Sequence, residues 1–110
     1  MDETGPVVDA TIVIEAYAEP TPPGAAPGDP VLTLAMTVLA ADKQARLRGV
    51  HARVTELRTT PAGGPPTRAQ ADLAVRAADE PTLAAYVAEL TRQATARAER
   101  DGTGVSLTPR

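Results

Sequence analysis

The sequence predicts an α+β domain in which two helices cover one face of a four-stranded antiparallel sheet. Three observations lead to this class. Apolar and polar residues alternate in four short runs, as in half-buried strands, and two longer stretches repeat apolar residues at helical spacing. The six segments follow one another as strand, helix, strand, strand, helix, strand. The chain has 110 residues, which is the length of one domain.

The first strand is predicted over residues 7–17, where Ile12 and Ile14 share one face and charged residues occupy the other. Its β-branched content supports a strand. We expect residues 1–6 before it to fray.

Residues 19–30 hold five prolines and two glycines. Proline fixes φ and removes a donor, so this segment is predicted to be a loop, either a stiff connector or a loop that holds a site.

Residues 31–48 fit two structures. A helix would begin well, because Asp29 can act as the N-cap and Pro30 suits the first helical position. The alanine-rich second half also favours a helix, and Gly49 is a typical residue to end it. The N-terminal half alternates as a strand does, which leaves a hairpin over residues 31–57 as the alternative. We favour the helix.

The second half of the chain has the clearest pattern. Residues 50–59 and 70–76 alternate as strands, and a turn region rich in proline and glycine separates them. A helix is predicted over residues 81–102, after an acidic start and up to a glycine. A last strand is predicted at residues 105–107, and we expect residues 108–110 to fray.

This order is that of the ferredoxin-like fold, the split βαβ arrangement. Aliphatic side chains are predicted to fill the layer between sheet and helices: Ile12, Ile14, Leu39, Val54, Leu73, Val75, Leu83, Val87 and Leu90. The opposite face of the sheet would show polar and charged side chains: Asp9, Glu15, His51, Arg53, Asp72 and Arg76. Such a face is either a solvated ladder of cross-strand pairs or a ligand-binding surface.

The first helix is apolar on two faces along its N-terminal half. One face suffices to cover the sheet, and a helix that is apolar all round is normally buried on both sides. In a chain this small the second face needs a partner molecule, and two-fold dimers are the commonest assembly. We therefore expect a homodimer whose interface includes Val31, Leu34, Val38 and Ala41.

Composition argues against several classes of function. The net charge is -3, from 11 basic and 14 acidic residues, and aromatic residues are scarce, so no nucleic-acid partner is expected. Zero Cys and one His exclude disulfides, thiol catalysis and a multi-histidine metal site, and we expect no cofactor. No apolar run reaches membrane-spanning length and the first residues are acidic, so we expect a cytoplasmic protein without a membrane partner. The usage of Ala, Arg, Pro and Thr suggests a GC-rich bacterial genome.

Two segments carry a family resemblance: Gly49-Val-His-Ala-Arg-Val-Thr-Glu-Leu57, and Ala71-Asp-Leu-Ala-Val-Arg76 with the helix from Pro81. They resemble the dimerisation (lid) domain of the M20 family of zinc peptidases and amidohydrolases, the glutamate carboxypeptidase and carbamoylase group. In that family a Gly-Val-x-Ala-x-Val-x-x-Leu strand leads through a loop into a strand that ends Asp-x-Arg. The resemblance covers residues 7–108. It implies a lid-like fold as a stand-alone domain, without the metal-binding catalytic domain.

The chain also departs from that family. Lids of the family carry a His-Ala-Gly segment after the first strand, whose His reaches the partner subunit's active site, whereas Ala18-Glu-Pro-Thr-Pro-Pro-Gly24 has no His. An Asn-x-Ile-Pro type segment is replaced by Gly63-Gly-Pro-Pro-Thr67. Arg76 matches the Arg of the family pattern, but His51 does not stand at the family's His position. Peptidase activity is therefore not expected of these residues.

Two main functions remain open. The first is a non-catalytic dimerisation or interaction module, alone or beside a separate enzyme or other protein partner. The alternative is a small dimeric enzyme or ligand-binding protein of specialised metabolism that uses the open sheet face. Histidine can exchange protons near neutrality, and tyrosine and arginine can hold an oxyanion or carboxylate. The candidate catalytic residues of this alternative are His51, Tyr17, Glu15, Asp72 and Arg76. A regulatory effector-binding domain of similar topology is a third interpretation.

Overall fold

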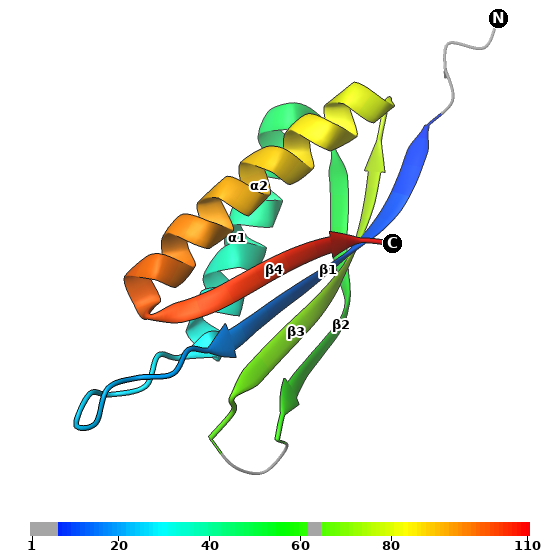
Figure 1. The fold of residues 1–110 in the computed structure, drawn as a ribbon. Helices are drawn as coiled ribbons and strands as arrows, with labels where there is room; N and C mark the ends of the chain where they lie inside the picture. The colour runs from blue at the N-terminus through cyan, green and yellow to red at the C-terminus, as the bar shows by residue number, and fades with distance from the viewer. Residues whose placement is uncertain (1–6, 62–64) are drawn as a thin grey trace, which may run out of the picture.

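The fold was analysed in a computed structural model that describes residues 7–61 and 65–110. Its elements follow in the order β1 (Val8–Ala18), α1 (Pro30–Arg48), β2 (His51–Thr60), β3 (Arg68–Ala77), α2 (Glu80–Asp101) and β4 (Thr103–Pro109). Figure 1 shows both helices on one face of a single twisted sheet. The predicted α+β, ferredoxin-like class is therefore confirmed.

The four strands form one antiparallel sheet in the order β2-β3-β1-β4. The two central strands are therefore β3 and β1, and Leu73 of β3 pairs with Ile12 of β1 and with Val54 of β2. A register shift between Val54 and Glu56 marks a bulge in β2. The edges of the sheet are β2, with ten residues, and β4, with seven residues ending at Pro109.

Both helices start and end as their sequences predict. The carboxylate of Asp29 accepts hydrogen bonds from the backbone N–H groups of Val31 and Leu32, which excludes the hairpin alternative for this segment. Gly49 ends α1 in the left-handed conformation at φ 67°, where a side chain would be strained. Asp79 caps α2 in the same way through the N–H of Thr82. Neither helix, within the part of the chain that the structure describes, is long and apolar enough to cross a bilayer.

The core lies between the sheet and the helices and is built from small aliphatic side chains. Alternate residues of β1 and β3 point into it, and most of the predicted residues are buried or partly buried there. The largest fully buried side chain is Tyr86 of α2, whose hydroxyl donates a hydrogen bond to the carbonyl oxygen of Ala41 at 2.9 Å. The other members are Ala, Ile, Leu and Val: Ile12, Ile14, Ala16, Leu34, Ala41, Ala45, Val50, Ala69, Ala71, Leu73, Val75, Ala77 and Leu90.

The face that α1 turns towards the sheet differs from the prediction. Leu39 was expected to pack on the sheet, but it is exposed, so this part of the prediction is wrong. The buried face instead includes Thr33 and Thr37, together with Leu34 and Ala41. Buried threonines are tolerated here because their hydroxyls are bonded: that of Thr37 donates to the carbonyl oxygen of Thr33 at 2.8 Å.

A polar cluster fastens the start of α1 to the end of α2. The Thr33 hydroxyl donates to the carboxylate of Asp101 at 2.9 Å and lies 2.6 Å from the hydroxyl of Thr103. The same carboxylate accepts from Nε of Arg97 at 2.9 Å. Gly28 approaches the backbone here so closely that a Cβ would lie 2.6 Å from the carbonyl oxygen of Asp101. The cluster satisfies these buried polar groups and fixes how the proline-rich loop returns to the domain.

The C-terminal end of the chain differs from the prediction. Thr108 and Pro109 continue β4 opposite Val13 and Ile12, and the N–H of Arg110 donates to the carbonyl oxygen of Thr11 at 2.7 Å. The expected fraying of residues 108–110 is therefore not observed, because β1 is long enough to pair with them. The expectation for residues 1–6 concerns a part of the chain outside the described residues, as do residues 62–64 of the second turn region.

Candidate functional site

The open face of the sheet, which no helix covers, carries the predicted polar residues in rows across the strands. The first row joins His51 of β2, Arg76 of β3 and Asp9 of β1, which are direct cross-strand partners. Arg76 donates to both carboxylate oxygens of Asp9, at 2.7 and 3.0 Å. This bonding lowers the pKa of Asp9 and raises that of Arg76. Both side chains are exposed, so the pair contributes little to stability.

A hollow of about 910 Å³ lies over the next row, which consists of Arg53, Ala74 and Thr11. The methyl group of Ala74 leaves space that a longer side chain would fill. Arg110 closes the hollow on the β4 side, next to Thr11. We call this feature, lined by Thr11, Arg53, Ala74 and Arg110 with the first row at one end, the Ala74 hollow.

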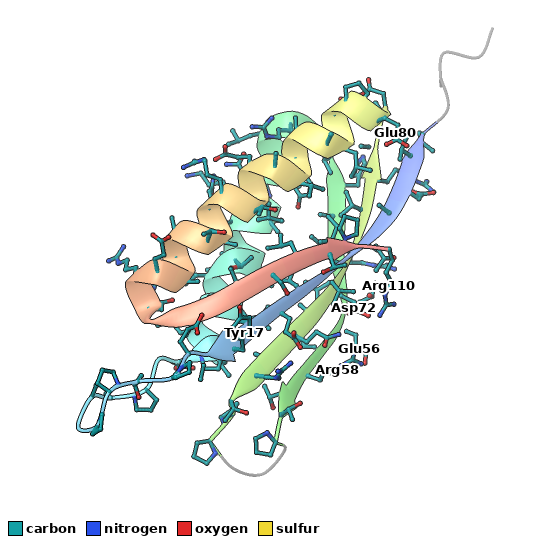
Figure 2. All side chains as sticks on the ribbon, viewed as in Figure 1. Tyr17, Glu56, Arg58, Asp72, Glu80 and Arg110 are labelled. Carbon is teal, nitrogen blue, oxygen red and sulfur yellow. The ribbon has the colours of Figure 1, made fainter. Side chains whose placement is uncertain are left out.

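Asp72 lies in the following row and is almost fully buried, although it stands on the open face. Its neighbours across the strands are Val13 of β1 and Glu56 of β2. Its carboxylate accepts a long hydrogen bond of 3.4 Å from Gln70, and Arg110 lies 4.0 Å away, at the limit of an ion pair. Figure 2 shows Asp72 near Glu56 and Arg110 on this face.

The remaining predicted residues lie towards the other end of the sheet. Glu15 accepts from Arg68 at 3.2 Å. Tyr17 pairs with Gly104 of β4, and its ring lies so close that a Cβ there would be 2.3 Å from it. The Tyr17 row is eight residues along β3 from the His51 row, a separation of about 27 Å in an antiparallel strand. Figure 2 likewise shows Tyr17 apart from Asp72 and Arg110.

The five candidate catalytic residues therefore share a face but do not converge on one point. Among these five, only His51 and Arg76 are cross-strand partners, and Arg76 is engaged by Asp9. Sequence reasoning placed Arg53 on this face but missed the role of Arg110, because its position depends on the register between β1 and β4. Among the described residues, no three His, Cys, Asp or Glu side chains are grouped as a metal site requires.

The four residues predicted to contact a partner differ in burial. Leu34 and Ala41 are buried in the core of this chain, and Val38 is partly buried against it, whereas Val31 is exposed. Met36 and Ala40 line a small hollow with residues of α2, so that side of α1 faces α2. By the helical repeat, Val31 and Val38 lie on the opposite flank, towards β2, which α1 also contacts.

Comparison with known proteins shows where this fold occurs. No protein-family model matches the sequence, and no curated protein matches it. The structure is similar to a hydantoinase/carbamoylase family amidase from Burkholderia ambifaria, with a TM-score of 0.84 and 14% identity over 97% of this chain. A second such amidase, from Burkholderia multivorans, gives a TM-score of 0.78 and 19% identity over 93% of this chain. A dinuclear metal-binding peptidase of the M20 family from Bacillus subtilis gives 0.72 and 14% over 94%.

This fold occurs within M20-family enzymes. The resemblance predicted from the sequence is thereby confirmed for the fold. The chain spans 28% and 27% of the two amidases and 25% of the peptidase, so it corresponds to about a quarter of each enzyme. In this M20-type fold, Arg76 lies next to the last residue of β3 and pairs with Asp9 of β1, and the loop after β1 carries prolines.

Proposed function

We propose that this chain is a non-catalytic dimerisation module with an M20-type, lid-like fold. The observation that carries the proposal is the exposed apolar flank of α1 beside an uncovered strand edge. Val31 and Ala35 of α1 are exposed there, Leu39 is exposed one turn further on at the adjoining outer face of the helix, and Leu57 of β2 is also exposed. Leu57 pairs with the buried Ala71, which places its side chain on the helix side of the sheet. We call Val31, Ala35, Leu39 and Leu57 the β2-side surface.

The strand edge beside this surface supports the same proposal. An edge strand offers a row of backbone donors and acceptors to another chain, and two copies can extend one sheet across a two-fold axis. Of the two edges, β4 is short and ends at a proline, which blunts it. Strand β2 is longer, and α1 packs beside it. We therefore propose that two copies pair along β2 and bury their β2-side surfaces against each other.

The test is the oligomeric state of a matched pair of variants. Leu39 and Leu47 lie on the same helix and are similarly exposed, at 62% and 68%, but Leu47 points away from β2 by the helical repeat. Leu39→Lys buries a charge in the proposed interface, whereas Leu47→Lys leaves it in water. Val38 is less suitable, because it packs against the core and a charge there would also destabilise the monomer.

Light scattering after size exclusion should give a wild-type mass of twice the 11.4 kDa of the chain. Leu39→Lys should give the monomer mass with an unchanged circular dichroism spectrum, and Leu47→Lys should stay dimeric. Hydrogen exchange adds a second measurement: the amides of β2 that point away from β3 should exchange slowly only in the dimer. A wild-type monomer at every concentration, or dissociation by both variants alike, would rule out this interface.

A further inference from the structure

The free edge of β2 presents its backbone groups at uneven spacing. In an antiparallel sheet each residue directs its N–H and C=O groups to the same side, and successive residues alternate between the two sides of the strand. The carbonyl oxygen of Thr60 accepts from the N–H of Thr67 at 2.8 Å, so Thr60 is directed towards β3. Alternation then directs Thr59 and Leu57 towards the free edge.

The direction of the other half of β2 follows from the central strands. The N–H of Ala18 donates to the carbonyl oxygen of Thr67 at 2.9 Å, so the even-numbered residues of β1 are directed towards β3. Their partners are the odd-numbered residues of β3, so the even-numbered residues of β3 are directed towards β2. The β2 partner of Ala74 is therefore directed towards β3, which leaves its neighbours Ala52 and Val54 on the free edge.

Four residues of β2 thus offer backbone groups to another chain: Ala52, Val54, Leu57 and Thr59. Because of the bulge, two residues separate Val54 from Leu57, whereas one residue separates the members of each outer pair. A second β2 in antiparallel orientation carries the same bulge, and in one register the two bulges lie opposite each other. Ala52 then pairs with Thr59 of the second copy, and Val54 pairs with Leu57. Every other register leaves at least one of the four residues without a partner in β2.

The side chains on the helix side favour this register. Leu57 is 62% exposed in the single chain, and it would lie against Val54 of the second copy. The two-fold axis repeats this contact, so both leucines are covered. Val54 is itself only partly buried, and Val31 and Ala35 of α1 are exposed beside the same edge. The register therefore removes apolar surface from water on both copies.

The charges on the open face favour it as well. Among the described residues Arg53 takes part in no ion pair, whereas Arg58 is paired with Glu56 of its own chain. In this register Arg53 lies opposite Arg58 of the second copy, one step along the strand from its Glu56. The two Glu56 carboxylates lie near the two-fold axis between two arginines from each copy. A carboxylate has about four lone-pair sites, so Glu56 can accept from Arg58 of its own chain and from Arg53 of the other.

We propose that two copies pair along β2 in this register and that Arg53 of each copy bonds to Glu56 of the other. This inference rests on the dimerisation proposed above, and it adds the alignment of the two strands and a contact between the subunits. The bulge sets the alignment, because it makes the spacing of the edge-facing residues match itself in only one way.

Engineered cysteines test the register, because the chain has no Cys of its own. Arg53→Cys and Arg58→Cys are prepared as separate variants and mixed at a concentration where light scattering shows dimers. A disulfide needs Cα atoms within about 7 Å, and close antiparallel pairs lie about 4.5 Å apart. Mild oxidation of the mixture should give a covalent dimer of twice 11.4 kDa on a non-reducing gel. Each variant alone should stay monomeric on the gel, because the same position in two copies is roughly 15 Å apart.

Matched mixtures distinguish the alternatives. A register that pairs Leu57 with Leu57 would bring position 53 opposite position 60, and one that pairs Val54 with Val54 would bring position 51 opposite position 58. The control mixtures are therefore Arg53→Cys with Thr60→Cys, and His51→Cys with Arg58→Cys, and both should cross-link at least about 10-fold more slowly. Faster cross-linking in a control would refute the register and leave dimerisation along β2 standing. No cross-link in any mixture of a dimeric protein would refute pairing along β2, and a wild-type monomer would refute dimerisation itself.

The contact between Arg53 and Glu56 has its own test. Arg53→Gln should raise the dissociation constant of the dimer about 2- to 30-fold, the effect of two exposed ion pairs, as measured by light scattering in a dilution series. Arg100→Gln, which removes an exposed arginine of α2, should change it less than about 2-fold. Arg53→Gln should have little further effect in a Glu56→Gln background. An equal effect in both backgrounds would refute the ion pair.

Discussion

The hydroxyl of Tyr86 gives the sharpest test of how the core is held together. Tyr86 is fully buried on α2 and donates a hydrogen bond to the carbonyl oxygen of Ala41 at 2.9 Å. Tyr86→Phe removes this bond and leaves the ring in place. A bond of this kind contributes about 1 kcal/mol, so the variant should be less stable by about that amount at pH 8.

High pH should remove this difference. Burial, with a smaller contribution from the Asp42 charge, raises the pKa of Tyr86 from 10.0 to about 12. The neutral form is the one favoured in the folded state, so the contribution of Tyr86 to stability is complete below pH 10 and is lost as the pH rises towards 12. At pH 11 the unfolded state gains about 1.4 kcal/mol more from ionisation than the folded state does. Phenylalanine cannot ionise, so the advantage of the wild type over Tyr86→Phe should fall from about 1 kcal/mol at pH 8 to near zero at pH 11.

The assay is urea unfolding followed by circular dichroism at pH 8 and pH 11, at one fixed protein concentration because any dimer adds to stability. Tyr17→Phe is the matched control at pH 8. That side chain is only partly buried on the open face, so its substitution should change the unfolding free energy by less than about 0.5 kcal/mol. If the difference between wild type and Tyr86→Phe stays constant from pH 8 to pH 11, the assignment of a buried, neutral phenol is wrong.

Three further predictions concern polar and close contacts. Thr33→Val should lower the free energy of unfolding, measured in urea, by about 1–3 kcal/mol, because the nearly buried carboxylate of Asp101 loses a donor. Thr33→Ser keeps the hydroxyl and should recover most of the lost stability. A serine variant as unstable as the valine variant would contradict the role of the hydroxyl. Gly28→Ala should cost about 1–3 kcal/mol, seen as a lower melting temperature, since its Cβ would lie 2.6 Å from backbone oxygen; an unchanged melting temperature would show that the loop can move away. Arg76→Gln should cost less than about 1 kcal/mol, because its pair with Asp9 is exposed. NMR titration of that variant should show the pKa of Asp9 returning towards its ordinary value, and no rise would mean that Arg76 is not its cause.

The fold could be predicted from the sequence because several local signals agreed. Asp29 and Gly49 mark both ends of α1, and the same signals bound α2, so segment type and order followed without tertiary information. The face that α1 buries could not be predicted. Its two apolar stripes are similar in hydrophobicity, and the buried one also contains Thr33 and Thr37, whose burial depends on hydrogen bonds that form only in the folded chain.

The candidate site was predictable only in part, because it too depends on contacts that form only in the folded chain. Alternation along single strands placed His51, Arg53 and Arg76 on one face, and the structure places them there. Alternation says nothing about how far along the sheet two residues lie, so Tyr17 was grouped with residues about 27 Å away. The approach of Arg110 to Thr11 follows from the pairing of the first and last strands, which no local pattern reports.

The alanine-rich core has a consequence for how this protein responds to mutation. Eight buried alanines among the described residues let the helices lie close to the sheet, at positions 16, 41, 45, 69, 71, 77, 94 and 98. The other buried hydrophobic residues are isoleucines, leucines, valines and Tyr86, which is the largest, and their truncation would leave cavities. At the alanines the damaging substitutions should instead be enlargements, in which a valine or leucine forces a helix away from the sheet. A deep mutational scan of this chain should therefore show intolerance at these small positions as well as at the large ones, and at the alanines tolerance should follow side-chain volume more closely than hydrophobicity.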